Sequence, residues 1–194
     1  IEALKKRAAG NHNCSVECGD SNILVTQLVA NLQKSRYDKY HFAFIDPFGP
    51  DGLKFTTLGE LAKLKRMDML IHFPIGAIQR NWQTWIQKEN TILDDFLGTN
   101  IWRESLMGIS GKRIVKELVG IFKNQLKSIG YPEDGLRMAS SDSGIDAELP
   151  TVPIKNTKER ELYVLILAAK NPLAQKIWNS VITVSPDGQR NISF

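Results

Sequence analysis

Two short apolar segments, each followed by a loop-forming residue, constrain the fold of this chain more than any other feature. The first, residues 42–45, reads Phe-Ala-Phe-Ile and is followed by Asp46 and Pro47. The second, residues 67–74, reads MDMLIHFP and closes on a proline. The continuous apolar run at residues 42–45 is typical of a parallel strand that is buried on both faces of a sheet, and residues 67–74 predict a further buried strand.

Helix-like segments stand between the strand-like ones. Apolar residues recur at helical spacing over residues 24–32 and 58–64, and Asp20 or Ser21 is placed to cap the first helix. Residues 13–20, NCSVECGD, form an earlier extended run that ends at Asp20. The order strand, helix, strand, helix, strand predicts an α/β fold whose sheet is mainly parallel, with right-handed crossovers.

The rest of the chain adds helices and one further strand. Residues 75–130 are helical by period, and we interpret them as a helical insertion or subdomain. Residues 131–157 are rich in Gly, Ser, Pro and Asp, which favours an exposed loop. Residues 161–170 form the most hydrophobic strand, a helix through Trp178 follows, and residues 181–194 fit a hairpin with a Pro-Asp-Gly turn.

Length and composition suit one α/β domain spanning residues 1–194. The chain is 42% hydrophobic and 24% charged, with no apolar run long enough to cross a bilayer and no secretory leader at its start. We therefore expect a cytoplasmic protein. The first residues, IEALKKR, look like a helix already under way, so we expect further sequence before Ile1 and interpret the chain as the carboxyl-side part of a longer domain.

The two cysteines, Cys14 and Cys18, lie on the extended run that precedes Asp20. A bond between them would bend the backbone away from an extended path, so we expect reduced thiols. With no second cysteine pair nearby, buried structural cysteine is favoured over a metal site, and no metal is expected.

Three polar residues close the three expected strands: Asp20, Asp46 and His72. In an open α/β sheet, ligands bind beyond the carboxyl ends of the strands, so we expect these residues to lie on one rim. The proline and glycine residues of 47–52 force an irregular loop directly after Asp46.

Several segments resemble the three-Cys-motif partner proteins, a family of methyltransferase-like proteins. The segments VECGDSN, FAFIDPFGPDGLKFTTLGELA and DMLIHFPIGAIQRN carry the resemblance over most of residues 13–82, and LYVLILAAKNPLAQKIW carries it over residues 160–178. The DPFG element is the distinctive one. The resemblance implies a Rossmann-like class I methyltransferase fold, S-adenosylmethionine as cofactor, and a three-Cys-motif protein as a possible partner.

The resemblance also implies roles for individual residues. Asp20 would accept a hydrogen bond from the adenine amine of the cofactor, with Asn22 beside it. Asp46, Pro47, Phe48 and Gly49 would form the loop that holds a target NH2, and Phe48 would stack on an unpaired base. Methyl transfer is an in-line displacement that needs alignment more than acid or base, so these few groups suffice.

The chain departs from the family pattern in two respects. Phe48 and Gly49 stand where amino-methyltransferases carry a second proline and an aromatic residue, and no glycine-rich loop precedes Asp20. In the methyltransferase strand order 3-2-1-4-5-7-6, the strands ending at Asp20 and Asp46 flank two strands that this chain lacks. We therefore expect either upstream sequence or a rearranged sheet in which these two strands pair directly.

Each of these residues also has a plain structural interpretation. Asp20 fits a helix cap, and His72 fits a hydrogen-bonded core histidine. Four basic residues are candidates for phosphate contacts and equally fit solvated helix faces: Arg80, Lys112, Arg113 and Lys116. The net charge of +4 is compatible with a nucleic-acid partner without requiring one.

Two functions therefore remain open at the level of sequence. The first is an S-adenosylmethionine-dependent methyltransferase that acts on a nucleic-acid amine. The second is a non-catalytic module with a degenerate methyltransferase fold that binds a partner protein.

Overall fold

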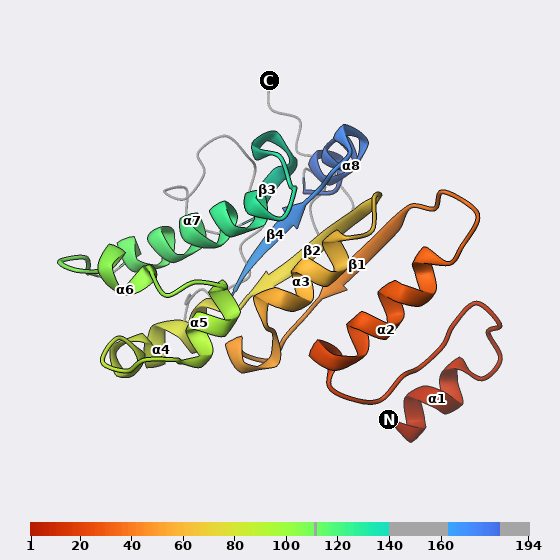
Figure 1. Ribbon diagram of the computed structural model, residues 1–194, viewed down its shortest axis with the longest axis horizontal. Helices are drawn as coiled ribbons and strands as arrows, with labels where there is room; N and C mark the ends of the chain where they lie inside the picture. The colour runs from red at the N-terminus through yellow and green to blue at the C-terminus, as the bar shows by residue number, and fades with distance from the viewer. Residues whose placement is uncertain (111, 140–162, 183–194) are drawn as a thin grey trace.

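The computed structural model describes residues 1–110, 112–139 and 163–182 and shows a mixed α/β arrangement (Figure 1). The helices are α1 (Glu2–Ala8), α2 (Ser21–Gln33), α3 (Phe55–Ala62), α4 (Ile75–Trp85), α5 (Ile92–Leu97), α6 (Trp102–Ser105), α7 (Lys112–Ser128) and α8 (Pro172–Ile182). The strands are β1 (His41–Ile45), β2 (Met67–Phe73), β3 (Leu136–Ala139) and β4 (Val164–Ala168), and short 3-10 turns lie at Pro50–Gly52 and Glu133–Gly135.

The four described strands form one sheet in the order β1-β2-β4-β3. β1 and β2 are parallel, with Ile45 opposite Ile71, as the alternation of strands and helices predicts. β4 is antiparallel to both β2 and β3, so the expectation of a mainly parallel sheet is wrong. β2 and β3 run in the same direction. β4 lies between them and runs in the opposite direction, so both of its pairings are antiparallel.

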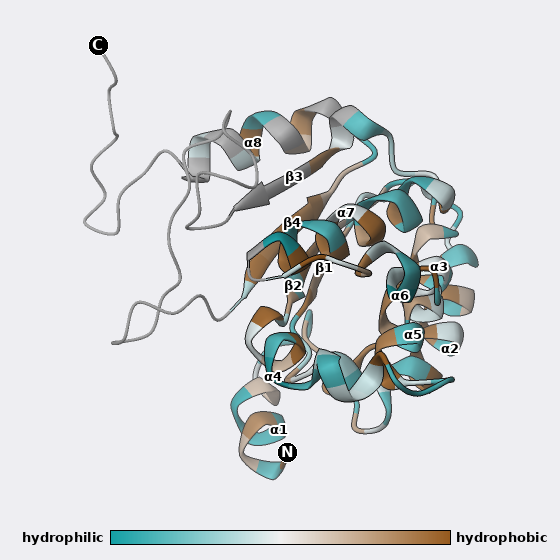
Figure 2. Ribbon diagram, turned by 90° about the vertical axis from the view of Figure 1, so that its left-hand side faces the viewer, coloured by the Kyte–Doolittle hydropathy of each residue, from teal (hydrophilic) through white to brown (hydrophobic). Residues whose placement is uncertain are grey.

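The two faces of the sheet are covered unequally. On one face, the alternate β2 residues Met67, Met69, Ile71 and Phe73 are at most 3% exposed and pack in the main core with residues of α2, α3, α5 and α7. On the other face, α8 lies over β4 and places Trp178 against Leu167 and Ala169. Figure 2 shows α8 on the opposite side of the sheet from α2 and α3.

β1 is partly buried on one face and exposed on the other, which corrects the expectation of a strand buried on both faces. Ala43 and Ile45 pack against the main core, whereas Phe42 and Phe44 are 64% and 60% exposed. Within the described part of the chain, α8 reaches the β4 side of this face and leaves the β1 side uncovered. The continuous apolar run at residues 42–45 therefore reflects an exposed apolar surface on this face of β1, where the sequence predicted a second buried face.

Residues 13–20 do not form a strand, which corrects the first expected β element. The segment is irregular, Val16 is half-buried, and the other residues are exposed. Cys14 and Cys18 are free, as expected, but they are exposed where buried cysteines were predicted. Val16, between the two cysteines, buries too little apolar surface to stabilise a strand. Direct pairing of this segment with residues 41–45, which was one of the two expected arrangements, is consequently absent from the described sheet.

The helices α4 to α7 fall in the range 75–130 and contribute Ile75, Phe96, Trp102 and Phe122 to the same core as the sheet. β3 lies at the start of the segment 131–157, where a loop was predicted, because Leu136 pairs with Ala168 of the most hydrophobic strand. Residues 140–157 lie outside the described residues, as do residues 183–194 of the expected hairpin. Residues 181 and 182, which were predicted to begin that hairpin, are instead the last residues of α8. Of the described helices, none combines the length and apolar character that a bilayer span requires.

A partly buried ion pair joins α5 to α6. Asp94 accepts hydrogen bonds from the Thr91 backbone N–H at 2.6 Å, from Trp102 Nε1 at 2.7 Å and from Arg103 Nη2 at 2.8 Å. Burial by itself would raise the pKa of Asp94, but the hydrogen bonds from Arg103, Thr91 and Trp102 outweigh it and lower the pKa from 3.8 to about 2.

This lowered pKa makes stability depend on pH below pH 4. A carboxyl group whose folded pKa lies below its unfolded value stabilises the fold when ionised, and that contribution is lost as the pH falls through the folded pKa. We expect the ionised Asp94 to contribute about 2 kcal/mol, which disappears between about pH 4 and pH 2. Urea denaturation across this range should therefore show a stability difference between the wild type and Asp94→Asn that closes at low pH. Asp95→Asn, on the exposed neighbouring residue, is the matched control, and equal pH profiles for the two variants would contradict the assignment to Asp94.

Candidate functional site

A cavity of about 790 Å³ lies between α2 and β1 and extends to the carboxyl end of β1. Its walls are mainly apolar, with Leu24 and Leu28 from α2 and Ala43 and Ile45 from β1. The segment before α2 contributes Glu17, Gly19 and Ser21, and the loop after β1 contributes Asp46, Pro47, Phe48 and Gly52. Two of the three segments that the sequence placed on one rim therefore meet around one cavity.

Asn22 holds these two segments together. Its side-chain oxygen accepts hydrogen bonds from the Lys54 backbone N–H at 2.9 Å and from Thr57 Oγ1 at 2.6 Å. Its side-chain nitrogen donates to Asp20 Oδ1 at 2.9 Å and to the Gly52 carbonyl at 3.5 Å. Asn22 lies beside Asp20, as predicted, but its amide group is engaged by the protein itself.

Asp20 caps α2 by accepting a hydrogen bond from the Asn22 backbone N–H at 2.9 Å on its Oδ1 atom. Within the described residues, its second carboxylate oxygen makes no hydrogen bond, and the residue is exposed. Its chain neighbours Gly19 and Ser21 line the cavity. The capping role and an outward-facing acceptor role are therefore compatible in the same side chain.

Asp46 lies directly after β1 and contacts His72, the sixth residue of β2. The parallel register places Ile45 opposite Ile71, so the next residue of each strand comes together, and Asp46 Oδ1 hydrogen-bonds His72 Nδ1. The Asp46 side chain is 58% exposed, whereas His72 is 17% exposed and its ring lies 4.1 Å from that of Tyr163. His72 thus fits the expected hydrogen-bonded histidine, and it orients the carboxylate of Asp46.

The loop after Asp46 presents an aromatic side chain to solvent. Pro47, Gly49 and Pro50 are buried, whereas Phe48 is fully exposed. A Cβ atom at Gly49 would come within 2.8 Å of Asp51 Oδ1, so a larger residue there would displace that side chain. The buried prolines fix the loop backbone while Phe48 remains accessible to a ligand.

The basic residues assigned to nucleic-acid contact do not reach this cavity. Arg80 is exposed on α4, Arg113 and Lys116 are exposed on α7, and Lys112 is the first residue of α7. The residues that line the cavity include no lysine or arginine. Within the described part of the chain, no cluster of three His, Cys, Asp or Glu side chains could hold a metal ion.

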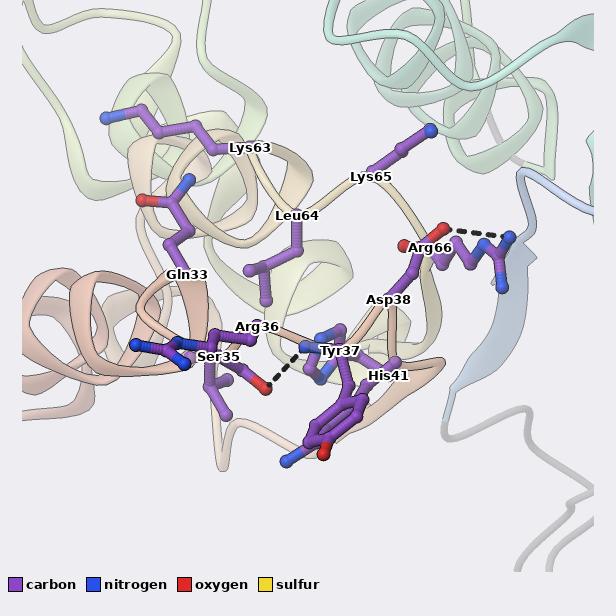
Figure 3. A pocket seen from close by; sticks show the side chains of 12 residues that line it. Gln33, Ser35, Arg36, Tyr37, Asp38, His41, Lys63, Leu64, Lys65 and Arg66 are labelled. Carbon is purple, nitrogen blue, oxygen red and sulfur yellow. Dashed lines mark hydrogen bonds and ion pairs between the residues drawn. The ribbon is translucent and has the colours of Figure 1, made fainter.

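A second hollow, of about 360 Å³, lies at the amino ends of β1 and β2 (Figure 3). It is lined by residues of the turn between α2 and β1 and of the turn between α3 and β2. Sequence reasoning missed it. The available signal was that the charged turns KSRYDKY and KLKR precede two neighbouring parallel strands, so both turns must lie at the same edge of the sheet.

Comparison with models of protein families, with curated proteins and with solved structures found no match to this chain.

Proposed function

We propose that this chain is part of an S-adenosylmethionine-dependent methyltransferase that acts on a nucleic-acid amine. The observation that carries the proposal is the strand order of the sheet, β1-β2-β4-β3. Numbered along the chain as strands 4, 5, 6 and 7, these strands stand in the order 4-5-7-6, which is the second half of the methyltransferase order 3-2-1-4-5-7-6. The last of the four described strands lies inside the sheet, as strand 7 does in the methyltransferase order.

The location of the cavity agrees with this order. It lies at the carboxyl end of the strand that corresponds to strand 4, which is where ligands bind in open α/β sheets. Gly19 and Ser21, the chain neighbours of Asp20, border it on one side, and Asp46, Pro47 and Phe48 border it on the other. These are the two segments that the family resemblance assigns to cofactor and substrate.

The residues present fit the adenine end of the cofactor. The cavity wall of Leu24 and Leu28 is apolar, as an adenine ring requires, and Asp20 has a carboxylate oxygen available to accept from the exocyclic amine. When bound, the cofactor supplies the electrophilic methyl group. The glycine-rich loop that would hold its methionine end has no counterpart before Asp20.

The chain's own residues would orient the substrate. Asp46, held by His72, accepts a hydrogen bond from the target NH2 and fixes the direction of the nitrogen lone pair. Phe48, which is free of protein contacts that would bury it, stacks on the base. The buried prolines on either side hold the loop in place, so alignment requires little rearrangement.

Methyl transfer from labelled S-adenosylmethionine to pools of RNA and DNA oligonucleotides tests this function. Asp46→Asn retains the shape of the side chain and removes its charge, and we expect about a 100-fold loss of methyl incorporation, the order seen when one orienting or stabilising group is removed from an active site. Asp51→Asn, an exposed carboxylate of the same loop, is the matched control and should keep wild-type activity. Equal incorporation by the wild type and Asp46→Asn would remove Asp46 from the mechanism.

A specific observation also favours the second function, a partner-binding module with a degenerate methyltransferase fold. Among the described strands, β1 pairs with β2 alone, and its other edge faces the apolar cavity. Phe42 and Phe44 on β1 and Leu28 on α2 are more than half exposed. An apolar surface beside an open strand edge suits the addition of a strand from another polypeptide.

Calorimetric titration of S-adenosylhomocysteine separates the two functions. The methyltransferase proposal expects heat from the wild type and a weaker signal from Asp20→Ser, which keeps a helix-capping side chain and loses the carboxylate. The partner-binding function expects no heat from either protein, and that result would overturn the methyltransferase proposal.

A further inference from the structure

The hollow at the amino ends of β1 and β2 gathers positive charge from two turns. The residues that line it include five cationic side chains, from Arg36, Lys39, Lys63, Lys65 and Arg66. Asp38 is the one carboxylate among the lining residues. Because the net charge of the whole chain is +4, this one site carries as much excess positive charge as the protein overall.

Some of these cationic side chains form ion pairs within the protein, and the others can pair with a ligand. Arg66 Nη2 lies 2.8 Å from Asp38 Oδ2, and Lys63 Nζ lies 2.6 Å from Glu60 Oε1. Arg36, Lys39 and Lys65 are exposed and form no ion pair within the described residues. In Figure 3, Arg36, Lys63 and Lys65 extend outward around the rim, and Leu64 occupies the centre.

Neutralisation of helix ends explains only some of these residues. Lys63 is the C-cap of α3, and Lys34 is the C-cap of α2, where cations stabilise the negative end of the helix dipole. That effect falls off within the last turn of a helix. Arg36, Lys39 and Lys65 lie beyond the last turns, so the helix dipole does not account for them.

An exposed aromatic ring accompanies the available cations. Tyr37 is 80% exposed and belongs to the same turn as Arg36 and Lys39. The neighbouring Tyr40 differs, because the Arg66 guanidinium lies 4.7 Å from its ring centroid and Asn171 donates to its hydroxyl group at 3.3 Å. Tyr37 thus offers a ring face for stacking while Tyr40 is held within the protein.

We propose that this hollow binds the phosphate backbone of a single-stranded nucleic acid, with one base stacked on Tyr37. Cations that follow a backbone and an aromatic ring that stacks on a base are the two elements of single-strand recognition. The nature of the ligand rests on the proposed function and deepens it. β1 separates the hollow from Asp46 by five residues, or about 17 Å, so a strand of a few nucleotides can contact both sites.

Fluorescence anisotropy with a labelled RNA strand of about 12 nucleotides tests the electrostatic part of this proposal. The variant R36E/K39E/K65E reverses the three available charges. The matched control K5E/K6E/R7E makes the same change on α1, which has no buried residues. We expect the first variant to bind at least tenfold more weakly, the control to change less than threefold, and the slope of log affinity against log salt to fall by about 2 for the first variant only. Equal weakening by both variants, or no binding by the wild type, would overturn the site.

A second variant tests the stacking part. Tyr37→Ala should weaken binding of the single strand about tenfold and leave binding of a duplex of the same length unchanged, because paired bases offer no free face to the ring. Equal losses for single strand and duplex would overturn the role of Tyr37. All of these measurements are made without cofactor and read out binding alone. A failure of methyl transfer therefore leaves this proposal standing, and a failure of binding leaves the methyltransferase test standing.

Discussion

Replacing Trp102 by alanine is expected to lower the free energy of unfolding by about 4 kcal/mol, the usual cost of deleting a large buried aromatic side chain. Trp102 is completely buried in the main core, and its Nε1 atom donates to Asp94 at 2.7 Å. The Arg103 guanidinium also lies 4.5 Å from the Trp102 ring centroid. Removal of the ring would leave a cavity and would also weaken the ion pair between α5 and α6.

Urea denaturation followed by circular dichroism measures this effect, and Trp102→Phe is the informative control. Phenylalanine keeps most of the buried ring and loses the Nε1 hydrogen bond, so we expect a cost of about 1.5 kcal/mol. If alanine and phenylalanine were equally destabilising, the hydrogen bond would carry the effect, and the packing argument would be wrong.

Gly98→Ala is expected to cost about 3 kcal/mol, through backbone strain and overpacking together. Gly98 ends α5 with a φ of +72°, a left-handed conformation that side chains disfavour. An added Cβ atom would also lie 2.6 Å from Cγ of Phe55. Phe55 has no room to move away, because its ring packs edge-to-face on Phe122 at a centroid distance of 5.8 Å.

Gly108 provides a matched control for this prediction. Its φ is +75°, almost the same as that of Gly98, but an added Cβ atom would meet no other atom within 4 Å. Gly108→Ala should therefore cost only the backbone term, about 1 kcal/mol. Comparing the thermal or urea unfolding midpoints of Gly98→Ala and Gly108→Ala separates backbone strain from steric overlap. An equal loss of unfolding free energy in the two variants would exclude a steric contribution from Phe55.

The parts of the fold that the sequence predicts are those fixed by local pattern. Residues 21–33, 67–73 and 112–128 have a clear apolar period, and each forms the expected element. Residues 13–20 failed because an extended segment becomes a strand only when a neighbour offers hydrogen bonds, and this segment has little to bury. The direction of β4 was also beyond local pattern, because the same apolar residues fit either orientation in a sheet.

The candidate site shows the same division. Because Asp46 and His72 lie at the carboxyl ends of parallel strands, the sequence predicts that both lie on the same rim. Their direct contact depends on the register of β1 against β2, which the sequence does not reveal. The network around Asn22 depends on the path of residues 50–54, which turn back toward α2. Proline and glycine predicted an irregular path there without fixing its direction.

The network around Asn22 has a further consequence. One amide group ties the start of α2 to the segment that follows the DPFG loop, so a displacement on one side of the cavity is transmitted to the other. Two small molecules that bound at these two places would influence each other to the extent that binding shifts the segments that Asn22 joins. Occupancy of one would change the affinity for the other, and by thermodynamic necessity the influence would be the same in both directions.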